Sequence, residues 1–280
     1  MQSIHLKAPA KINFRLDVLR KRDDGYHDLR MLMQRIDLSD ELLIEISDKP
    51  GITLYTNDNG LPLDKKNIVW RAADAILAKT NKNIGVKISL IKNIPVAAGL
   101  GGGSSDAAAT LVGLNKLFDF KISDTELMKM GVTLGADVPF FIFEKPAIAE
   151  GIGDILTPLE NIPTAWIVLV NPNIQVSTAW VYQNLGLTTE KVKDIIPLLY
   201  CSVADISKIF LNDLERVTIK RFPVIGEIKD RLLQSGALGS LMSGSGATVF
   251  GIFENREAAH NAAEALKKDS DWFVAVTKTI

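Results

Sequence analysis

Residues 95 to 108 read Pro95-Val96-Ala97-Ala98-Gly99-Leu100-Gly101-Gly102-Gly103-Ser104-Ser105-Asp106-Ala107-Ala108. The stretch lies between an alternating apolar segment, which predicts a strand, and a segment with helical spacing. Glycine lets a backbone approach a ligand closely and adopt positive φ. The amino terminus of the following helix offers free N–H groups and the positive end of a dipole, to which anions bind. Ser104 and Ser105 add hydroxyl donors, or a route to a magnesium ion. These features together predict a phosphate-binding loop.

Two common nucleotide motifs do not match this loop. It contains no G-x-x-x-x-G-K-[ST], and the dinucleotide pattern G-x-G-x-x-G fails because Ser104 stands at the last position. The alternative to phosphate binding is a flexible turn whose small residues allow tight packing. The preceding strand, the following helix and a Ser-Ser-Asp cap favour the phosphate loop.

The segments on either side of the loop predict a mixture of strands and helices. Period-two alternation predicts strands over 12–18, 31–38, 41–47, 52–56, 86–90, 166–170, 248–253 and 272–276. Helical spacing predicts helices over 67–79, 107–117, 177–182, 223–233 and 257–267, and around 206. Ser123 and Glu126 form a capping box for a further helix, which we expect to end at Gly135. The elements do not alternate regularly, so the predicted class is α+β rather than doubly wound α/β.

The overall composition limits the kinds of protein that this chain can be. Its 280 residues are 47% hydrophobic and carry a net charge of -1, which argues against a nucleic-acid binder with a basic surface. One cysteine, Cys201, excludes an intrachain disulfide, and with three scattered histidines it does not make a zinc cluster. No signal peptide and no apolar run of ~20 residues is present, so we expect a cytoplasmic protein.

The glycine loop and six further stretches, in the family's order along the chain, resemble the GHMP kinases. The glycine loop resembles that family's P-x-x-x-G-L-G-S-S-A-A, with extra glycine and with Asp106 after the serines. The other stretches are Pro9-Ala10-Lys11-Ile12-Asn13, Asp24-Gly25-Tyr26-His27, Gly135-Ala136-Asp137-Val138-Pro139-Phe140-Phe141, Gly151-Ile152-Gly153-Asp154, Asn171-Pro172 with Val176-Ser177-Thr178 and Tyr182, and Ser243-Gly244-Ser245-Gly246-Ala247. Asp154 and Ala247 depart from the family's frequent Glu and Pro, and these departures are conservative or lie away from the expected chemistry.

The resemblance implies a two-domain fold and a reaction. Residues 1–157 would form an ATP-binding domain similar to ribosomal protein S5, and residues 158–280 a ferredoxin-like domain, with the active site between them. The family transfers the γ-phosphoryl group of ATP, accompanied by Mg²⁺, to an alcohol. The loop variant resembles the branch that phosphorylates a tertiary hydroxyl of cytidine diphosphate methylerythritol, on the non-mevalonate route to isoprenoid precursors. The protein ligands of Mg²⁺ are not implied.

The resemblance assigns the catalytic roles to Lys11 and Asp137. Asp137 would accept or orient the proton of the attacking substrate hydroxyl, and Lys11 would lower its pKa and contact the transferred phosphate. Without the resemblance, Asp137 would be interpreted as a helix cap beside proline and Lys11 as a surface lysine. Asn13 alternates with Lys11 on one strand face, so both can point into one site.

The remaining site residues are assigned to the two ligands. For ATP they are residues 95–105 and Asn67. The alternative for Asn67 is simple helix capping. For the substrate they include Asn13 and Asp137. Three residues would hold the cytosine base, namely Tyr26, His27 and Tyr182, and Thr178 is a weaker contact. An aromatic face stacks on a base, and ring-edge hydrogen bonds then select cytosine. Gly244 and Gly246 either close over the substrate diphosphate or form a tight hairpin.

Three other functions remain open at this point. Another GHMP kinase, acting on homoserine, mevalonate or a sugar, would have no base for Tyr26, His27 and Tyr182 to hold. A nucleotide-binding regulator without turnover would not need Lys11 and Asp137. An RNA-binding module would suit an S5-like half, but the net charge argues against it.

Overall fold

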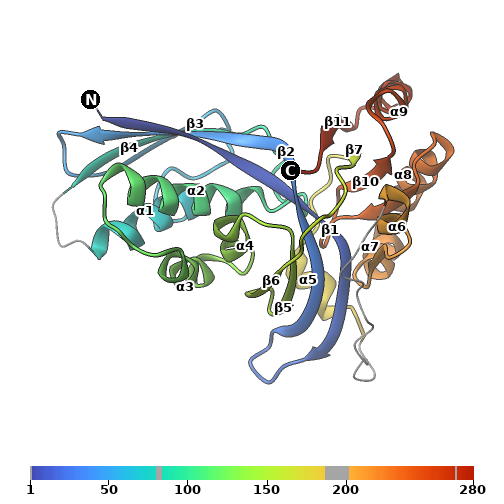
Figure 1. Ribbon diagram of the computed structural model, residues 1–280, viewed down its shortest axis with the longest axis horizontal. Coiled ribbons are helices and arrows are strands. Elements are labelled where there is room, and N and C mark those ends of the chain that lie inside the picture. The colour runs from blue at the N-terminus through green and yellow to red at the C-terminus, as the bar shows by residue number, and fades with distance from the viewer. Residues whose placement is uncertain (1, 80–83, 187–201, 269) are drawn as a thin grey trace. The chain divides into compact units, whose positions relative to one another are not determined.

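A computed structural model describes residues 2–79, 84–186, 202–268 and 270–280, and Cys201 lies outside these ranges. The chain divides into two compact units that are interleaved in sequence (Figure 1). The first unit comprises residues 1–10, 38–96 and 101–144, and the second comprises residues 11–37, 97–100 and 145–280. The glycine loop therefore contributes to both units. The domain boundary at 157/158 stays a prediction from the sequence, based on two prolines and a polar patch over 157–163.

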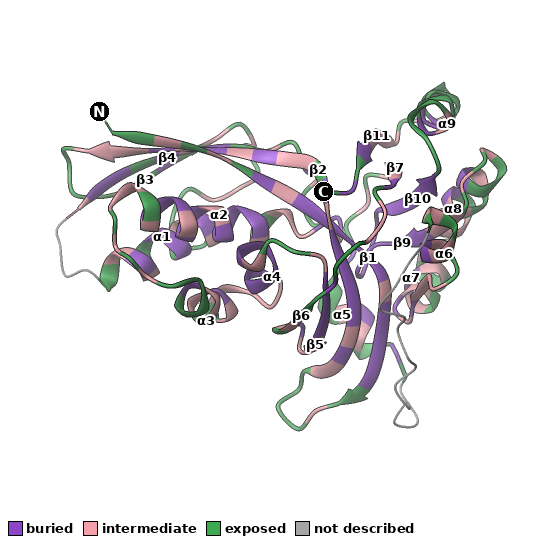
Figure 2. Cartoon of the chain, in the orientation of Figure 1, coloured by how far each residue is buried: buried purple, intermediate pink, exposed green. Residues whose placement is uncertain are grey.

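The first unit combines a sheet with helices. Its elements are residues 3–10 of β1 (Ser3–Lys21), residues 38–47 of β2 (His27–Ser47), β3 (Gly51–Thr56), β4 (Gly85–Ile91), α1 (Ile68–Ala78), α2 (Gly102–Leu117), α3 (Asp124–Leu134) and α4 (Val138–Phe143). β4 pairs parallel to β3 and antiparallel to β2. Figure 2 shows buried residues along both α1 and α2.

The alternation along β4 explains how this sheet and its helices pack. Val86, Ile88 and Leu90 are all buried, and Ile88 lies opposite Ile44 of β2. Helix α2 approaches the sheet at Gly113, where an added Cβ would lie 2.4 Å from Leu6 Cδ1 and 2.9 Å from the Cδ1 of Ile44. Glycine at this position therefore lets the helix lie close to the sheet without displacing the ends of the Leu6 and Ile44 side chains.

The second unit contains a ferredoxin-like arrangement. Its elements are residues 11–21 of β1, residues 27–37 of β2, β5 (Ala147–Gly151), β6 (Ile155–Pro158), β7 (Trp166–Asn171), α5 (Thr178–Gln183), α6 (Val203–Ser207), β8 (Leu211–Asn212), α7 (Glu215–Arg221), α8 (Val224–Gln234), β9 (Gly239–Met242), β10 (Val249–Phe253), α9 (Arg256–Lys268) and β11 (Phe273–Lys278). An antiparallel sheet has the order β11-β7-β10-β9, and α8 and α9 pack against it. The succession β7-α8-β9-β10-α9-β11 is the β-α-β-β-α-β motif, as expected for the C-terminal half.

Most of the predicted elements are confirmed. Ser123 and Glu126 make both bonds of the capping box, α3 ends at Gly135, and Ser177 caps α5 by accepting from the Trp180 backbone N–H. Helices α4 and α7 and strands β5, β6, β8 and β9 were not predicted. They are short, between 2 and 7 residues, so they carry little periodic signal.

Two predictions about the elements were wrong. The strands predicted over 31–38 and 41–47 form one continuous strand, β2, because the polar residues Ser39 and Asp40 interrupt the apolar pattern but not the strand. The helix predicted from Ala107 begins at Gly102. Ser104, Ser105 and Asp106 therefore lie within its first turns rather than capping it, and Asp106 binds Lys92 instead. In the described ranges, no helix is long and apolar enough to cross a membrane.

Candidate active site

The first part of the glycine loop, residues 97–100, packs against the loop 243–248 within the second unit. The Thr248 backbone N–H donates to the Ala98 carbonyl at 3.2 Å, and the Ser243 hydroxyl donates to the Gly99 carbonyl at 3.0 Å. Gly99 has φ +78°, and an added Cβ there would lie 2.2 Å from the Ser243 carbonyl oxygen. Only glycine satisfies both conditions, so the two small-residue motifs depend on each other's backbone.

The second part of the loop begins helix α2 in the first unit. Gly101 is its N-cap, with φ +70° and no side-chain cap. An added Cβ at Gly103 would lie 3.7 Å from Ile68 Cγ2, and one at Gly135 would lie 3.5 Å from Ser104 Oγ. The start of α2 is thus bordered by the start of α1 and by the Gly135-Ala136-Asp137 stretch. The uncapped N–H groups of this helix are suited to an anion.

Asn67 is the N-cap of α1, and both the oxygen and the nitrogen of its side-chain amide form hydrogen bonds. Its Oδ1 accepts from the Val69 N–H at 2.9 Å, and its Nδ2 donates to the Pro62 carbonyl at 2.8 Å. The helix-capping alternative is therefore what the structure contains. The predicted contact of Asn67 with the adenine stays a prediction.

Lys11 and Asn13 point to the same side of β1, as the alternation predicted. The Lys11 ammonium donates to Asn13 Oδ1 at 2.6 Å, and Asn13 Nδ2 lies 3.5 Å from Met31 Sδ. An added Cβ at Gly244 would lie 3.7 Å from Lys11 Nζ. Within the second unit, the lysine amine, the asparagine and the 243–248 loop therefore form one cluster.

Asn212 supports this cluster and was missed by the sequence analysis. From β8, which pairs with β1, its amide donates to the Met242 carbonyl at 2.8 Å and to the Gly244 carbonyl at 2.7 Å. Its Oδ1 accepts from the Leu214 N–H at 3.0 Å. A buried asparagine with three backbone bonds fixes the path of the loop. The sequence offered no signal beyond a polar pair, Asn212 and Asp213, after an apolar run.

His27 and Tyr182 stack on each other within the second unit. Their ring centroids are 4.9 Å apart and their planes are inclined by 27°. Partial burial, and to a lesser extent the charge of Lys21, lower the pKa of His27 below its ordinary value, so the neutral imidazole is favoured. Tyr26, which precedes His27 in the sequence, is 59% exposed. Thr178 Oγ1 lies 2.7 Å from Ser245 Oγ. The structure thus brings His27 and Tyr182 together from distant parts of the sequence.

Asp137 precedes helix α4 in the first unit. It is the N-cap by position, but its carboxylate makes no capping bond to the helix N–H groups, so helix capping does not account for it. Lys11 belongs to the second unit and Asp137 to the first. Their partnership in catalysis remains a prediction.

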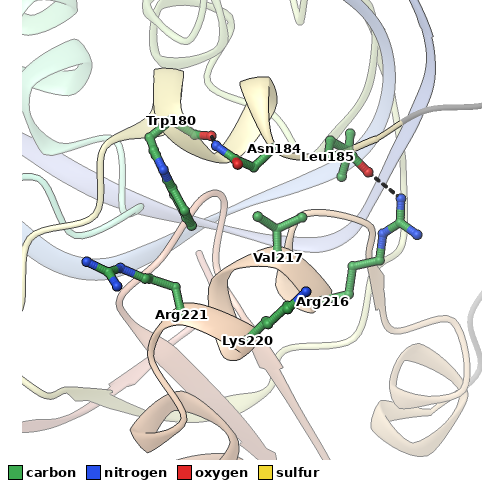
Figure 3. A pocket seen from close by; sticks show the side chains of 7 residues that line it. All are labelled: Trp180, Asn184, Leu185, Arg216, Val217, Lys220 and Arg221. Atoms are coloured by element: carbon green, nitrogen blue, oxygen red, sulfur yellow. Dashed lines mark hydrogen bonds between the residues drawn. The ribbon is translucent and has the colours of Figure 1, made fainter.

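The second unit also has a cavity of about 450 Å³ that no sequence prediction covered (Figure 3). It is lined by Trp180, Asn184, Leu185, Arg216, Val217, Lys220 and Arg221. The Arg216 guanidinium donates to the Leu185 carbonyl at 2.5 Å. None of the residues predicted to bind ATP or substrate lines the cavity, although Trp180 lies on α5 between Thr178 and Tyr182.

Comparison with known proteins is consistent with this architecture. The model of the GHMP kinases N terminal domain matches residues 67–145, and that of GHMP kinases C terminal matches residues 201–270. The 4-diphosphocytidyl-2-C-methyl-D-erythritol kinases of Geotalea daltonii and Geobacter sulfurreducens are 60% and 59% identical over the full length of both chains.

Solved structures agree with the sequence relatives. A 4-(cytidine 5'-diphospho)-2C-methyl-D-erythritol kinase superposes with a TM-score of 0.83, at 34% identity over 98% of this chain and 99% of the other. A homoserine kinase from Cytophaga hutchinsonii superposes with a TM-score of 0.77 at 22% identity, covering 100% of this chain and 95% of the other, and so shares the fold. The chain belongs to the 4-diphosphocytidyl-2-C-methyl-D-erythritol kinase family of the GHMP kinases.

Proposed function

We propose that this protein transfers the γ-phosphoryl group of ATP to the 2-hydroxyl of 4-diphosphocytidyl-2-C-methyl-D-erythritol, in the cytoplasm and on the non-mevalonate route to isoprenoid precursors. The chain is a GHMP kinase, and these kinases use ATP. The observation that carries the choice of substrate is the His27–Tyr182 ring stack. Aromatic faces at this position suit a base, whereas homoserine, mevalonate and sugars have none.

The start of α2 is the proposed site of the ATP phosphates. The N–H groups from Gly101 onward have no side-chain cap, and the helix dipole favours negative charge at this end. Loop residues 97–100 complete the phosphate loop, and Asn67 lies at the start of the neighbouring helix. This arrangement neutralises charge without a lysine of the G-K-[ST] type.

Mg²⁺ would accompany ATP, and the serine hydroxyls fit it. The Ser105 hydroxyl is buried and has no hydrogen-bond partner in the described ranges, so it is available to an oxygen-coordinated ion. The described residues contain no group of three His, Cys, Asp or Glu side chains that could hold a metal. When bound, Mg²⁺ would neutralise charge on the phosphates. We propose Ser104 and Ser105 as its protein contacts.

Phosphoryl transfer needs positioning and charge neutralisation more than covalent chemistry. Lys11 would contact the transferred phosphate, and Asn13, which accepts from its ammonium at 2.6 Å, would hold the lysine in place and contact the substrate. Asp137 would orient the substrate hydroxyl and accept its proton. The Asp137 carboxylate makes no capping bond to α4, so a catalytic role would not weaken that helix.

The cytosine ring would be held by Tyr26, His27 and Tyr182, with Thr178 near the substrate diphosphate. A neutral imidazole can both donate and accept, which matches the mixed donor and acceptor edge of cytosine. The 243–248 loop, fixed by Asn212 and by Thr178, lies near Lys11 and would contact the diphosphate.

Coupled measurement of ADP release tests this proposal. The purified protein is given ATP and Mg²⁺ with the cytidine diphosphate substrate, its uridine analogue, homoserine, mevalonate or galactose, and Lys11→Ala and Asp137→Asn serve as controls. Turnover confined to the cytidine substrate and lost in both variants is expected. Turnover with another alcohol would retain the kinase and reject the substrate. ATP binding without any turnover would instead indicate a nucleotide-binding regulator.

A further inference from the structure

A buried charge cluster in the first unit joins the two ends of the glycine loop. It consists of Asp40 on β2, Lys92 just after β4 and Asp106 in α2. The Lys92 ammonium contacts Asp40 Oδ2 and lies 2.7 Å from Asp106 Oδ2. The three side chains are only 7%, 0% and 3% exposed, in the order Lys92, Asp40 and Asp106. Burial of an ionic group costs free energy unless the group is paired, and here one lysine pairs with two carboxylates.

The carboxylate of Asp40 also binds the chain that leads into the loop. Its Oδ1 accepts from the backbone N–H of Asn93 at 2.5 Å and of Ile94 at 2.8 Å. The Asn93 amide in turn donates to the Ser39 carbonyl at 2.9 Å. The residues immediately before Pro95 are therefore bound to β2 at several points.

Asp106 binds the other end of the loop to the same lysine. It follows Ser105 directly, and its Oδ2 accepts from Lys92 at 2.7 Å. Gly102 lies against the cluster, since an added Cβ would be 3.1 Å from Ile94 Cγ2 and 3.3 Å from Lys92 Nζ. One lysine and two carboxylates thus connect the chain just before Pro95 to the chain just after Ser105.

The charges of the cluster do not balance when all three groups are ionised. Two carboxylates and one ammonium leave one negative charge, and Asp106 Oδ1 is buried with no hydrogen-bond partner in the described ranges. Within those ranges, the charged groups that act on Asp106 are Lys92 and Asp40. Burial and, to a lesser extent, the charge of Asp40 raise the pKa of Asp106 to about 7, although Lys92 opposes this.

Lys92 keeps its proton in this cluster. Burial alone would lower its pKa, but the two carboxylates raise it above the ordinary value. The ammonium therefore remains the cation that pairs with both carboxylates.

We propose that Asp40, Lys92 and Asp106 are positioning residues that hold the two ends of the phosphate loop together and so keep it in the conformation that accepts a polyphosphate. The inference rests on the proposed function, because it takes residues 95–105 as the phosphate site. Without the lysine, two carboxylates would be buried together, and the chain on both sides of the loop would lose its common anchor.

The experiment compares the KM for ATP and the KM for the alcohol substrate in four proteins: wild type, Asp106→Asn, Lys92→Met and Lys87→Met. Lys87 is the matched control, because it pairs with Glu45 at 3.0 Å across the same two strands, β4 and β2, away from the loop. Asp106→Asn should raise the KM for ATP less than Lys92→Met does, because its amide oxygen can still accept from Lys92.

Lys92→Met should raise the KM for ATP at least tenfold while the KM for the alcohol substrate changes less than twofold, and Lys87→Met should change neither. Thermal unfolding is measured in parallel to show that each variant folds. A fall in melting temperature for Lys92→Met with an unchanged KM for ATP would make the cluster merely structural and overturn the proposal. A larger rise in the KM for ATP in Asp106→Asn than in Lys92→Met would also overturn it. Absence of wild-type turnover would refute the proposed function instead, and the same comparison would then be made with the Kd for ATP.

Discussion

Gly99→Ala tests the packing between the two glycine-containing loops of the second unit. The substitution forces alanine into φ +78° and places its Cβ 2.2 Å from the Ser243 carbonyl oxygen. The positive φ alone costs about 1 kcal/mol. Relief of the overlap requires a shift of roughly 1 Å in the 243–248 loop, which adds about 1–3 kcal/mol as other overpacking does.

Gly236→Ala is the matched control for this variant. Gly236 has φ +92°, but an added Cβ meets no atom within 4 Å. Its variant therefore reports the backbone cost of about 1 kcal/mol without the overlap. The difference between the two variants measures the loop contact itself.

Thermal unfolding and steady-state ADP release give the two readouts. For a chain of this size, 1 kcal/mol corresponds to about 2–4 °C in melting temperature, so Gly236→Ala should lose a few degrees and Gly99→Ala about 4–16 °C. We expect only Gly99→Ala to raise the KM for ATP, by about tenfold, because its loop must move. Equal melting temperatures and equal KM values for the two variants would refute the proposed dependence of one loop on the other.

The remaining predictions concern the proposed chemistry and the cytosine site. Asp137→Asn should lower kcat by about 10²–10⁴ with a melting temperature near that of wild type, and retention of full turnover would remove Asp137 from the reaction. Tyr182→Ala should raise the KM for the cytidine substrate about 5- to 150-fold and that for ATP far less, since stacking on a base is worth ~1–3 kcal/mol. Because the pKa of His27 is lowered from 6.5, the KM for that substrate should stay level as the pH falls to 6.5 and rise only further below. A rise that persists unchanged in His27→Ala would assign it to another group. Asp106→Asn should unfold at a higher temperature than wild type at pH 8 but not at pH 4, because a pKa raised from 3.8 to about 7 gives stability that is lost as the pH rises through 7.

The sequence analysis succeeded where a signal was local. The alternation of Lys11 with Asn13 predicted that both side chains would lie on one face of a strand, and the two bond to each other. The S-x-x-E spacing predicted the capping box of α3. In each case the interacting residues are three or fewer positions apart, so strand or helix geometry alone determines whether they meet.

Contacts between distant parts of the sequence could not be predicted in the same way. Asn212 lies 32 residues from Gly244, and Asp40 lies 52 residues from Lys92. Nothing in the pattern around a single polar residue indicates which distant backbone it will bind. The family resemblance did place His27 and Tyr182 in one site, 155 positions apart, because it compares whole chains rather than local periods.

The glycine loop shows how a motif can be recognised correctly and still be assigned the wrong local structure. Its composition indicated an anion cradle that ends where the helix begins, at Ala107. Instead, Gly101, in the left-handed conformation, is the N-cap of a helix that begins at Gly102. The glycines also lie against different neighbours: Gly99 lies against Ser243, and Gly102 lies against Ile94 and Lys92. Asp106 is then too far into the helix to cap it, and its buried carboxylate requires a cation, which Lys92 supplies from the other side of the loop. The charge cluster is thus a consequence of an early helix start, because a loop that continued to residue 106 would have left that carboxylate to solvent or to the helix N–H groups.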